Sequence, residues 1–144
     1  MIYTEMTKKA MMIAFQAHKN QTDKSGMPYI YHPIHLAEQM QDEDTTIVAL
    51  LHDVIEDTDW TFDELTEQGF NANVIEAIKL MTHAEGVSYM DYVAQIKTNP
   101  IARAVKLADL RHNSDLTRLN EVNEKALARV EKYKKAIALL EEVK

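Results

Sequence analysis

Glycine and proline are so scarce in this sequence that the choice of fold narrows at once. Only three glycines and three prolines interrupt the 144 residues, whereas a protein built from many short strands needs frequent turn formers. No segment alternates apolar and polar residues for long enough to predict a strand. The sequence therefore predicts an all-α fold in which residues 1–144 form a single compact domain.

Recurrent apolar residues mark the first and last helices. Side chains spaced three and four residues apart lie on one face of a helix. Within residues 4–19 that spacing is kept by Met6, Ala10, Ile13 and Ala17. The clearest stripe lies near the end of the chain and consists of Ala126, Val130, Tyr133, Ile137 and Leu140. This last face suits a core or a second chain equally, so the sequence assigns no oligomeric state.

Turn formers and capping residues delimit the helices of the first half. Residues 23–29 contain glycine and proline and are expected to form a loop. Pro33 suits the first turn of a second helix, which we expect to run to about residue 42. Asp44 or Thr45 is the expected N-cap of the third helix, which we expect to contain residues 49–58.

Similar signals predict the later helices. Thr61 and Glu64 have the three-residue spacing of a capping box, which predicts a short fourth helix. Further helices are expected near residues 71–82 and 88–98. Pro100 opens another helix, which we expect to continue to residue 113.

Composition excludes several classes of protein. The formal net charge is −7 and no basic run is present, which disfavours binding to nucleic acid. No apolar run approaches the ~20 residues of a membrane span, and no signal peptide is recognisable. A cytoplasmic protein that binds neither nucleic acid nor a membrane is therefore expected. Because the chain lacks cysteine, any metal must be held by nitrogen and oxygen ligands.

Charged and imidazole side chains interrupt an apolar stretch in the middle of the sequence. Residues 49–58 have the sequence ALLHDVIEDT, in which apolar residues surround His52, Asp53, Glu56 and Asp57. On one continuous helix, His52 and Glu56 would share a face, and Asp53 and Asp57 would form the adjacent row. Burying a charge without a partner costs several kcal/mol. These groups are therefore either the solvated end of a helix or the ligands of something bound.

Two further segments carry the same kind of interruption. YHPIHLA contains His32 and His35, and VKLADLRHN contains Asp109 followed four residues later by Asn113. A divalent ion would account for all three segments, because its charge offsets the cost of burying carboxylates. Two imidazoles and two carboxylates suit Mn²⁺, Fe²⁺ or Zn²⁺ better than Ca²⁺. Such an ion lowers the pKa of bound water and polarises a phosphoryl oxygen.

The order of these residues resembles a known signature. His32, then His52 with Asp53, then Asp109 resembles the H…HD…D pattern of the HD-domain superfamily of metal-dependent phosphohydrolases. More closely, YIYHPIHLAEQM, ALLHDVIEDTDWTFDEL and VKLADLRHN are similar to segments of the hydrolase domain of the RelA/SpoT family and its small stand-alone relatives. Members of that family remove the 3′-pyrophosphate from guanosine tetraphosphate. The resemblance implies an HD-domain helical bundle with that class of activity.

The resemblance also implies a metal site. The ligands it implies are His32, His52, Asp53 and Asp109. The metal in this family is typically Mn²⁺, and Fe²⁺ or Zn²⁺ would suit the same ligands. His32 matches better than its neighbour His35, because the family's histidine directly precedes a proline.

The resemblance further implies groups for catalysis and for binding substrate. An acidic pair that orients or activates the attacking water and a residue near the scissile phosphate are matched by Glu56, Asp57 and Asn113. A loop residue that contacts the nucleotide and an R-V-x-x-Y pattern that helps to hold substrate are matched by Lys24, Arg129 and Tyr133. The implied partner is a small nucleotide.

Two departures concern recognition of guanosine. The family commonly has arginine and lysine before a Ser-Gly pair, and the arginine packs on the base. This chain has Asp23 and Lys24 there, so a stacking cation is replaced by an anion. The family's A-D-R-L-H-N is A-D-L-R-H-N here, which moves Arg111 to another face. We therefore expect a complete hydrolytic centre beside an incomplete guanosine-recognition shell.

Three functional hypotheses follow. The first is a metal-dependent phosphohydrolase whose leading substrate is guanosine tetraphosphate, with another nucleotide phosphate as the alternative. The second is a non-catalytic, metal-stabilised nucleotide sensor. The third is a helical scaffold without metal.

Some candidate residues also have structural interpretations. Asp109 could pair with Lys106 or Arg111, Tyr133 could simply pack in the core, and Arg129 could form a surface salt bridge. The remaining histidines, interpreted as structural or solvent-facing, are His18, His83 and His112.

Overall fold

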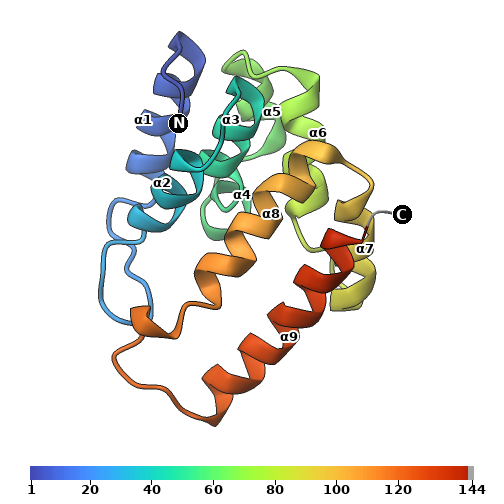
Figure 1. Ribbon diagram of the computed structural model, residues 1–144. Helices are drawn as coiled ribbons and strands as arrows, with labels where there is room; N and C mark the ends of the chain where they lie inside the picture. The colour runs from blue at the N-terminus through green and yellow to red at the C-terminus, as the bar shows by residue number, and fades with distance from the viewer. Residues whose placement is uncertain (143–144) are drawn as a thin grey trace.

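The computed structural model describes residues 1–142 and builds them from helices (Figure 1). In chain order these are α1 (Glu5–Ala17), α2 (Tyr31–Glu38), α3 (Glu43–Leu51), α4 (Val54–Asp57), α5 (Phe62–Glu67), α6 (Ala72–Met81), α7 (Tyr89–Lys97), α8 (Pro100–Asn113), the 3₁₀ turn η1 (Leu116–Arg118) and α9 (Glu124–Glu141). Extended pairing within these residues is limited to one isolated bridge, between Thr22 and Pro28. The predicted all-α fold is confirmed. No helix in the described part of the chain is long and apolar enough to cross a membrane.

Several helix ends lie where capping chemistry predicts them. Thr61 and Glu64 form the expected capping box at the start of α5. Asn99 caps α8, and Pro100 occupies the first helical turn, where its missing N–H costs nothing. Pro33 lies in the first turn of α2, as predicted, although that helix already begins at Tyr31.

The junction between α2 and α3 differs from the prediction. The N-cap of α3 is Asp42, and not Asp44 or Thr45, because Asp42 Oδ1 accepts a hydrogen bond from Thr45 N at 2.8 Å. Asp42 has extended backbone angles, with φ −131° and ψ 168°. The chain must therefore leave the helical conformation before Asp42, and α2 ends at Glu38 instead of near residue 42.

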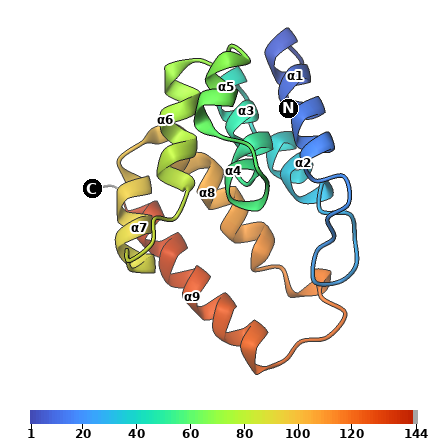
Figure 2. The same ribbon diagram turned by 180° about the vertical axis from the view of Figure 1, so that it is seen from behind.

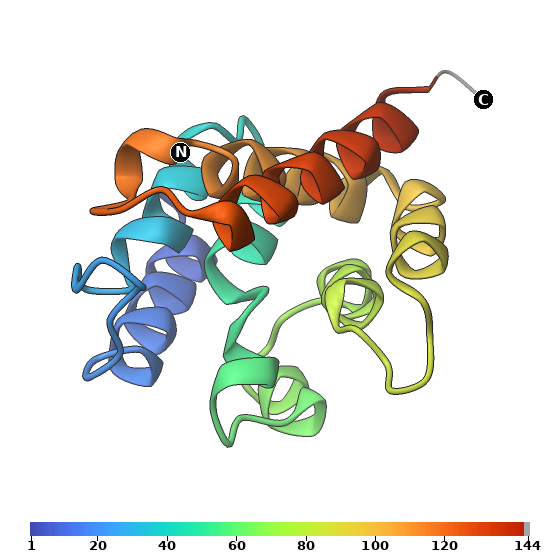
Figure 3. The same ribbon diagram turned by 90° about the horizontal axis from the view of Figure 1, so that it is seen from below.

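Helix α3 is the centre of the fold. Every residue from Thr45 to Leu51 is buried, and α1, α2, α6 and α8 pack around this segment. A helix that is apolar on all sides is stable only in an interior. Burial of each large aliphatic side chain there contributes about 1.5–3 kcal/mol. Figures 1 and 3 show α9 lying along α8 on one side of this centre.

The single helix predicted through residues 49–58 is wrong. Helix α3 ends at Leu51 and α4 begins at Val54, so His52 and Asp53 lie in the turn between two helices. Asp53 has φ −97° and ψ −4°, which departs from helical geometry. His52 is buried whereas Glu56 is exposed, so these two residues do not share one helix face.

Two segments that are distant in sequence lie side by side at one end of the molecule. They are residues 18–30, between α1 and α2, and the segment that contains η1 (Figures 1 and 2). Ser25 Oγ donates a hydrogen bond to Arg118 O at 2.9 Å, and Asn120 Nδ2 donates to Ser25 O at 3.2 Å. These bonds join the two segments into one wall of the pocket described below.

Candidate active site

Three of the predicted metal ligands meet in the interior. His32 comes from α2, His52 follows the end of α3, and Asp109 lies in α8. All three are buried, and one potential ligand atom from each lies within 4.8 Å of the others. His32 and Asp109 are 77 positions apart in the sequence, and they meet because α2 and α8 both pack against α3. We call these three residues the ligand cluster.

The protonation of His52 can be inferred from its contacts. His52 Nδ1 lies 2.8 Å from the carbonyl oxygen of Ala49, which can only accept, so Nδ1 carries a hydrogen. In the neutral ring Nε2 is then a bare lone pair. It lies 3.0 Å from Asp53 Oδ2 and 3.7 Å from Asp109 Oδ1, and it has no hydrogen-bond partner of good geometry. A lone pair and carboxylate oxygens repel one another unless a proton or a cation lies between them.

The same electrostatic conflict appears in the pKa values. Burial on its own would lower the pKa of His52, but the carboxylates of Asp53 and Asp109 reverse this and raise it well above the usual value. The carboxylates of Asp53 and Asp109 thus attract a positive charge to His52 Nε2. A divalent ion would supply this positive charge in place of a proton, so the imidazole and carboxylate donors fit a metal.

Asp109 connects the cluster to one cation and one amide. Its Oδ1 lies 2.8 Å from His32 Nε2 and accepts from Asn113 Nδ2 at 3.0 Å. Its Oδ2 accepts from Lys106 Nζ at 3.0 Å. Burial alone would raise the pKa of Asp109, but the Lys106 ammonium and the hydrogen bond with His32 hold it well below its usual range. The ion pair with Lys106, considered above as a structural alternative, is therefore present, and it leaves Oδ1 facing the histidines.

Asp53, the fourth predicted ligand, lies at the edge of the cluster. Tyr29 Oη donates a hydrogen bond to Asp53 Oδ2, the same oxygen that faces His52. Burial would raise the pKa of Asp53, but the positive charge that His52 carries when protonated lowers it. Burial followed by the Asp53 carboxylate raises the pKa of Tyr29, so this phenol stays protonated and remains a donor.

Glu56 and Asp57, the predicted acidic pair, are exposed on α4 immediately after the buried turn. Glu56 Oε1 accepts a hydrogen bond from His83 N at 2.9 Å, and Asp57 Oδ2 accepts from Gln21 Nε2 at 3.3 Å. Partial desolvation, and then the charge of Asp53, raises the pKa of Asp57. A carboxylate whose pKa is raised is a stronger proton acceptor, as a general base requires.

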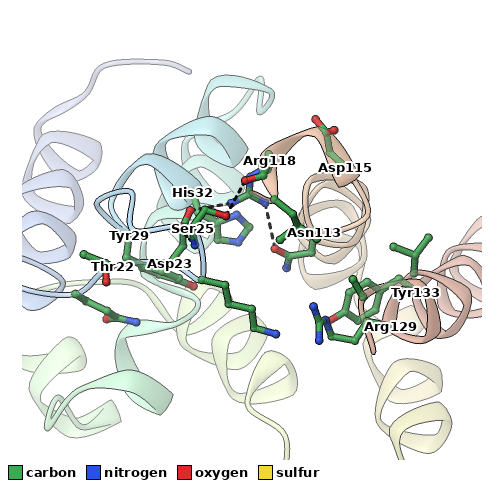
Figure 4. A pocket seen from close by; sticks show the side chains of 15 residues that line it. Thr22, Asp23, Ser25, Tyr29, His32, Asn113, Asp115, Arg118, Arg129 and Tyr133 are labelled. Atoms are coloured by element: carbon green, nitrogen blue, oxygen red, sulfur yellow. Dashed lines mark hydrogen bonds and ion pairs between the residues drawn. The ribbon is translucent and has the colours of Figure 1, made fainter. Parts of the chain in front are cut away.

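A pocket of about 340 Å³ opens beside the ligand cluster. The predicted site residues that line it are Lys24, His32, Asn113, Arg129 and Tyr133. Figure 4 shows Asp23, Ser25 and Tyr29 on one side of this pocket and Arg129 and Tyr133 on the opposite side. His32 belongs to both the pocket and the cluster. Tyr133 is half-buried and also packs against the hydrophobic core, so the packing interpretation is confirmed. Its role in holding substrate stays a prediction.

Arg118 also lines the pocket, and the sequence analysis missed it. Its Nη1 donates to His112 O at 2.9 Å and to Asn113 Oδ1 at 3.4 Å. Its Nη2 lies 3.8 Å from Asp23 Oδ2. Arg118 is in η1, a short turn with no apolar periodicity, so no local pattern identifies it as a pocket residue.

The structure shows the contacts made by Asp23 and Arg111, the two departures from the family pattern. Asp23 Oδ1 accepts hydrogen bonds from Ser25 N at 2.8 Å and Met27 N at 3.0 Å, which closes the loop. Its other oxygen faces Arg118, so the negative charge that Asp23 brings to the pocket is partly offset. Arg111 is exposed and pairs with Glu141 at 3.2 Å, outside the residues that line the pocket.

His112, which the sequence predicted to be structural or solvent-facing, contacts a member of the ligand cluster. It is half-buried, and its Nδ1 lies 2.7 Å from His32 Nδ1. Burial, followed by the charges of Arg118 and the neighbouring histidines, lowers the pKa of His112 to about 4. The ring is therefore neutral near pH 7.

Comparison with known proteins identifies the class that this fold and site define. The HD domain model matches residues 10–142, and the chain belongs to the HD domain family. The bifunctional (p)ppGpp synthase/hydrolase SpoT of Escherichia coli is 44% identical over 88 residues, which are 58% of this chain and 12% of that protein. The guanosine-3′,5′-bis(diphosphate) 3′-pyrophosphohydrolase of Aquifex aeolicus is 36% identical over 97 residues, 65% of this chain and 14% of that protein.

A longer alignment joins the chain to the GTP pyrophosphokinase of Myxococcus xanthus, with 33% identity over 144 residues, 88% of this chain and 19% of that protein. The chain thus spans less than a fifth of these curated relatives. A solved structure of a metazoan ortholog of SpoT that hydrolyzes ppGpp has the same fold, with a TM-score of 0.76 and 23% identity. That match covers 98% of this chain and 88% of the other. The predicted kinship with RelA/SpoT-type HD domains is confirmed.

Proposed function

We propose that this protein is a metal-dependent phosphohydrolase of a nucleotide, with guanosine-3′,5′-bis(diphosphate) as the leading substrate and its 3′-pyrophosphate as the group removed. One observation carries the proposal: His32 is shared by the buried ligand cluster and by a pocket of about 340 Å³. A molecule in that pocket would meet any ion held by the cluster. The names of the curated relatives in Escherichia coli and Aquifex aeolicus supply the nucleotide.

The proposed metal ligands are His32, His52, Asp53 and Asp109, and the proposed ion is Mn²⁺, with Fe²⁺ or Zn²⁺ as alternatives. When bound, such an ion supplies a nucleophilic water near neutral pH and offsets charge on a phosphoryl oxygen. The protein fixes the orientation of its own ligands. His52 Nδ1 donates to Ala49 O at 2.8 Å, which directs Nε2 toward the carboxylates.

The proposed catalytic residues are Glu56, Asp57 and Asn113. In this proposal Glu56 and Asp57 orient the attacking water and accept its proton, and the raised pKa of Asp57 supports a role as base. Asn113 Nδ2 donates to Asp109 Oδ1 at 3.0 Å, and its oxygen faces Arg118 at 3.4 Å. Asn113 would thereby hold Asp109 in position beside the phosphate that is cleaved.

The proposed substrate-binding residues are Lys24, Arg129 and Tyr133. The two cations and Arg118 line the pocket together with two acids, Asp23 and Asp115. The charged lining is therefore positive on balance in a chain whose net charge is −7, which favours phosphate. Tyr133 and the buried Val130 add an apolar wall suited to a base or a ribose. The cytoplasmic location expected from the sequence stays a prediction.

The proposal is tested by incubating the protein with Mn²⁺ and a panel of nucleotides while phosphate and pyrophosphate release are measured. Guanosine-3′,5′-bis(diphosphate) should release pyrophosphate, and a chelator should stop the reaction until Mn²⁺ is restored. Turnover of a different nucleotide would keep the chemistry and replace the substrate. Turnover that continues without divalent ions would contradict the proposal.

Asp23 supports another nucleotide as the second candidate, because an anion stands at the pocket wall. The balance between Asp23 and Arg118 can be tested directly. Arg118→Met should raise KM roughly 10–100-fold with little change in kcat, since a hydrogen bond to a charged group contributes about 1.5–3 kcal/mol. Asp23→Asn keeps an oxygen for Ser25 N and Met27 N but frees Arg118, so KM should fall or stay unchanged.

Steady-state kinetics on the best substrate of the panel measures both effects. Lys8→Met, on the exposed surface of α1, is the matched control for loss of one positive charge. An equal KM for Arg118→Met and Lys8→Met would remove Arg118 from the substrate site.

A further inference from the structure

His112 and His32 meet edge to edge. Their Nδ1 atoms are 2.7 Å apart, their ring planes differ by 4°, and their centroids are 5.0 Å apart. Parallel rings stacked face to face at that centroid distance could not bring two atoms so close. The two nitrogens therefore point at one another within a common plane, which is the geometry of a linear N–H···N hydrogen bond.

The direction of this bond follows from the other nitrogen of His32. His32 Nε2 lies 2.8 Å from Asp109 Oδ1, on the side of the ligand cluster. If Nε2 is to bind an ion as a neutral imidazole, the hydrogen of His32 must be on Nδ1. His112 Nδ1 must then be the acceptor, and the hydrogen of His112 must be on its own Nε2.

From this geometry we propose that His112 is a positioning residue that holds His32 in the tautomer and ring orientation needed to bind a divalent ion through Nε2. The inference rests on the metal site of the proposed function. For His52 the corresponding hydrogen-bond acceptor is a backbone carbonyl oxygen, Ala49 O, which can only accept. His32 depends instead on a side chain, so its preorganisation can be removed by mutation.

The surroundings of His112 fix its ring. His35 stacks on it with centroids 4.0 Å apart and planes 25° apart. Arg118 Nη1 donates to the carbonyl oxygen of His112 at 2.9 Å, which holds the end of α8 against η1. The acceptor nitrogen is therefore held in place from two sides. Partners that orient a ligating histidine typically change metal affinity about 10–100-fold when they are removed.

Two substitutions separate positioning from packing. His112→Asn keeps an acceptor oxygen close to the place of Nδ1 but loses the ring, whereas His112→Phe keeps a stacking ring and loses the acceptor. We expect Kd for Mn²⁺, measured by calorimetry without nucleotide, to rise about 10–100-fold in His112→Phe. In His112→Asn it should stay within a few-fold of the wild type. The opposite order, with Phe preserving affinity and Asn losing it, would mean that His112 only fills space and would overturn the inference.

A spectroscopic measurement tests the tautomer itself. In protein loaded with Zn²⁺, which is diamagnetic, long-range nitrogen-15 correlations should show the hydrogen of His32 on Nδ1. In His112→Phe that signal should weaken or move, and in His112→Asn it should persist. An unchanged His32 tautomer in both variants would contradict the inference. Because neither readout requires turnover, a protein that hydrolyses no nucleotide would refute the proposed activity and still leave the role of His112 measurable.

Discussion

Asp109→Asn is expected to abolish hydrolysis and to weaken Mn²⁺ binding by more than the ~10–100-fold typical of a supporting group. The carboxylate Oδ1 lies 2.8 Å from His32 Nε2 and 3.7 Å from His52 Nε2, so Asp109 faces both imidazoles. Asparagine keeps the size of the side chain but removes the charge that would hold the ion between them. Calorimetry with Mn²⁺ and pyrophosphate release measure the two effects.

The control for this variant addresses folding. Lys106 is 12% exposed and loses its ion-pair partner in Asp109→Asn, and breaking a buried pair typically costs about 3–5 kcal/mol. The double variant with Lys106→Met removes that unpaired charge and should recover much of the stability to urea. It should not recover Mn²⁺ binding. Wild-type Mn²⁺ affinity in either variant would exclude Asp109 as a ligand.

Replacement of the acidic pair has the second large effect. The double variant Glu56→Gln with Asp57→Asn is expected to lower kcat by about 10²–10⁴-fold, the usual contribution of general-base catalysis. Both side chains are exposed and neither belongs to the ligand cluster. Metal affinity and nucleotide binding should therefore be retained.

Asp59→Asn is the matched control, because Asp59 is an exposed acid in the same segment. It should leave kcat and the affinities unchanged. This comparison also separates the enzyme from a nucleotide sensor. A sensor would bind nucleotide and metal equally in all variants and would show no turnover to lose.

The all-α fold was predictable because its signals are local. The scarcity of glycine and proline, the stripe on α9 and the capping box at Thr61 each depend on neighbouring residues. The break at His52 and Asp53 was not predictable in this way. Apolar residues continue on both sides of the break, so the turn at His52 and Asp53 is seen only in the folded structure.

The residues of the candidate site also differ in how far local sequence patterns predict them. Spacing and motif resemblance identified the ligand cluster, since each residue lies in its own conspicuous segment. Contacts made across the fold were missed. Arg118 lies 95 positions from Asp23 in the chain, and His112 lies 80 from His32, so neither pairing leaves a local pattern. The setting of Asp23 illustrates the consequence, because an acid that is unfavourable in isolation acquires a cationic neighbour in the fold.

The most direct test of the proposed activity is phosphorus NMR of guanosine-3′,5′-bis(diphosphate) incubated with the wild-type protein and Mn²⁺. The spectra are recorded after a chelating resin has removed the Mn²⁺, because this ion is paramagnetic and broadens phosphate signals. The expected result is loss of the 3′-diphosphate signals and the appearance of free pyrophosphate and guanosine 5′-diphosphate in equal amounts. Asp109→Asn should leave the spectrum unchanged. Intact substrate in the presence of wild-type protein with Mn²⁺ demonstrably bound would contradict the account and favour a nucleotide sensor.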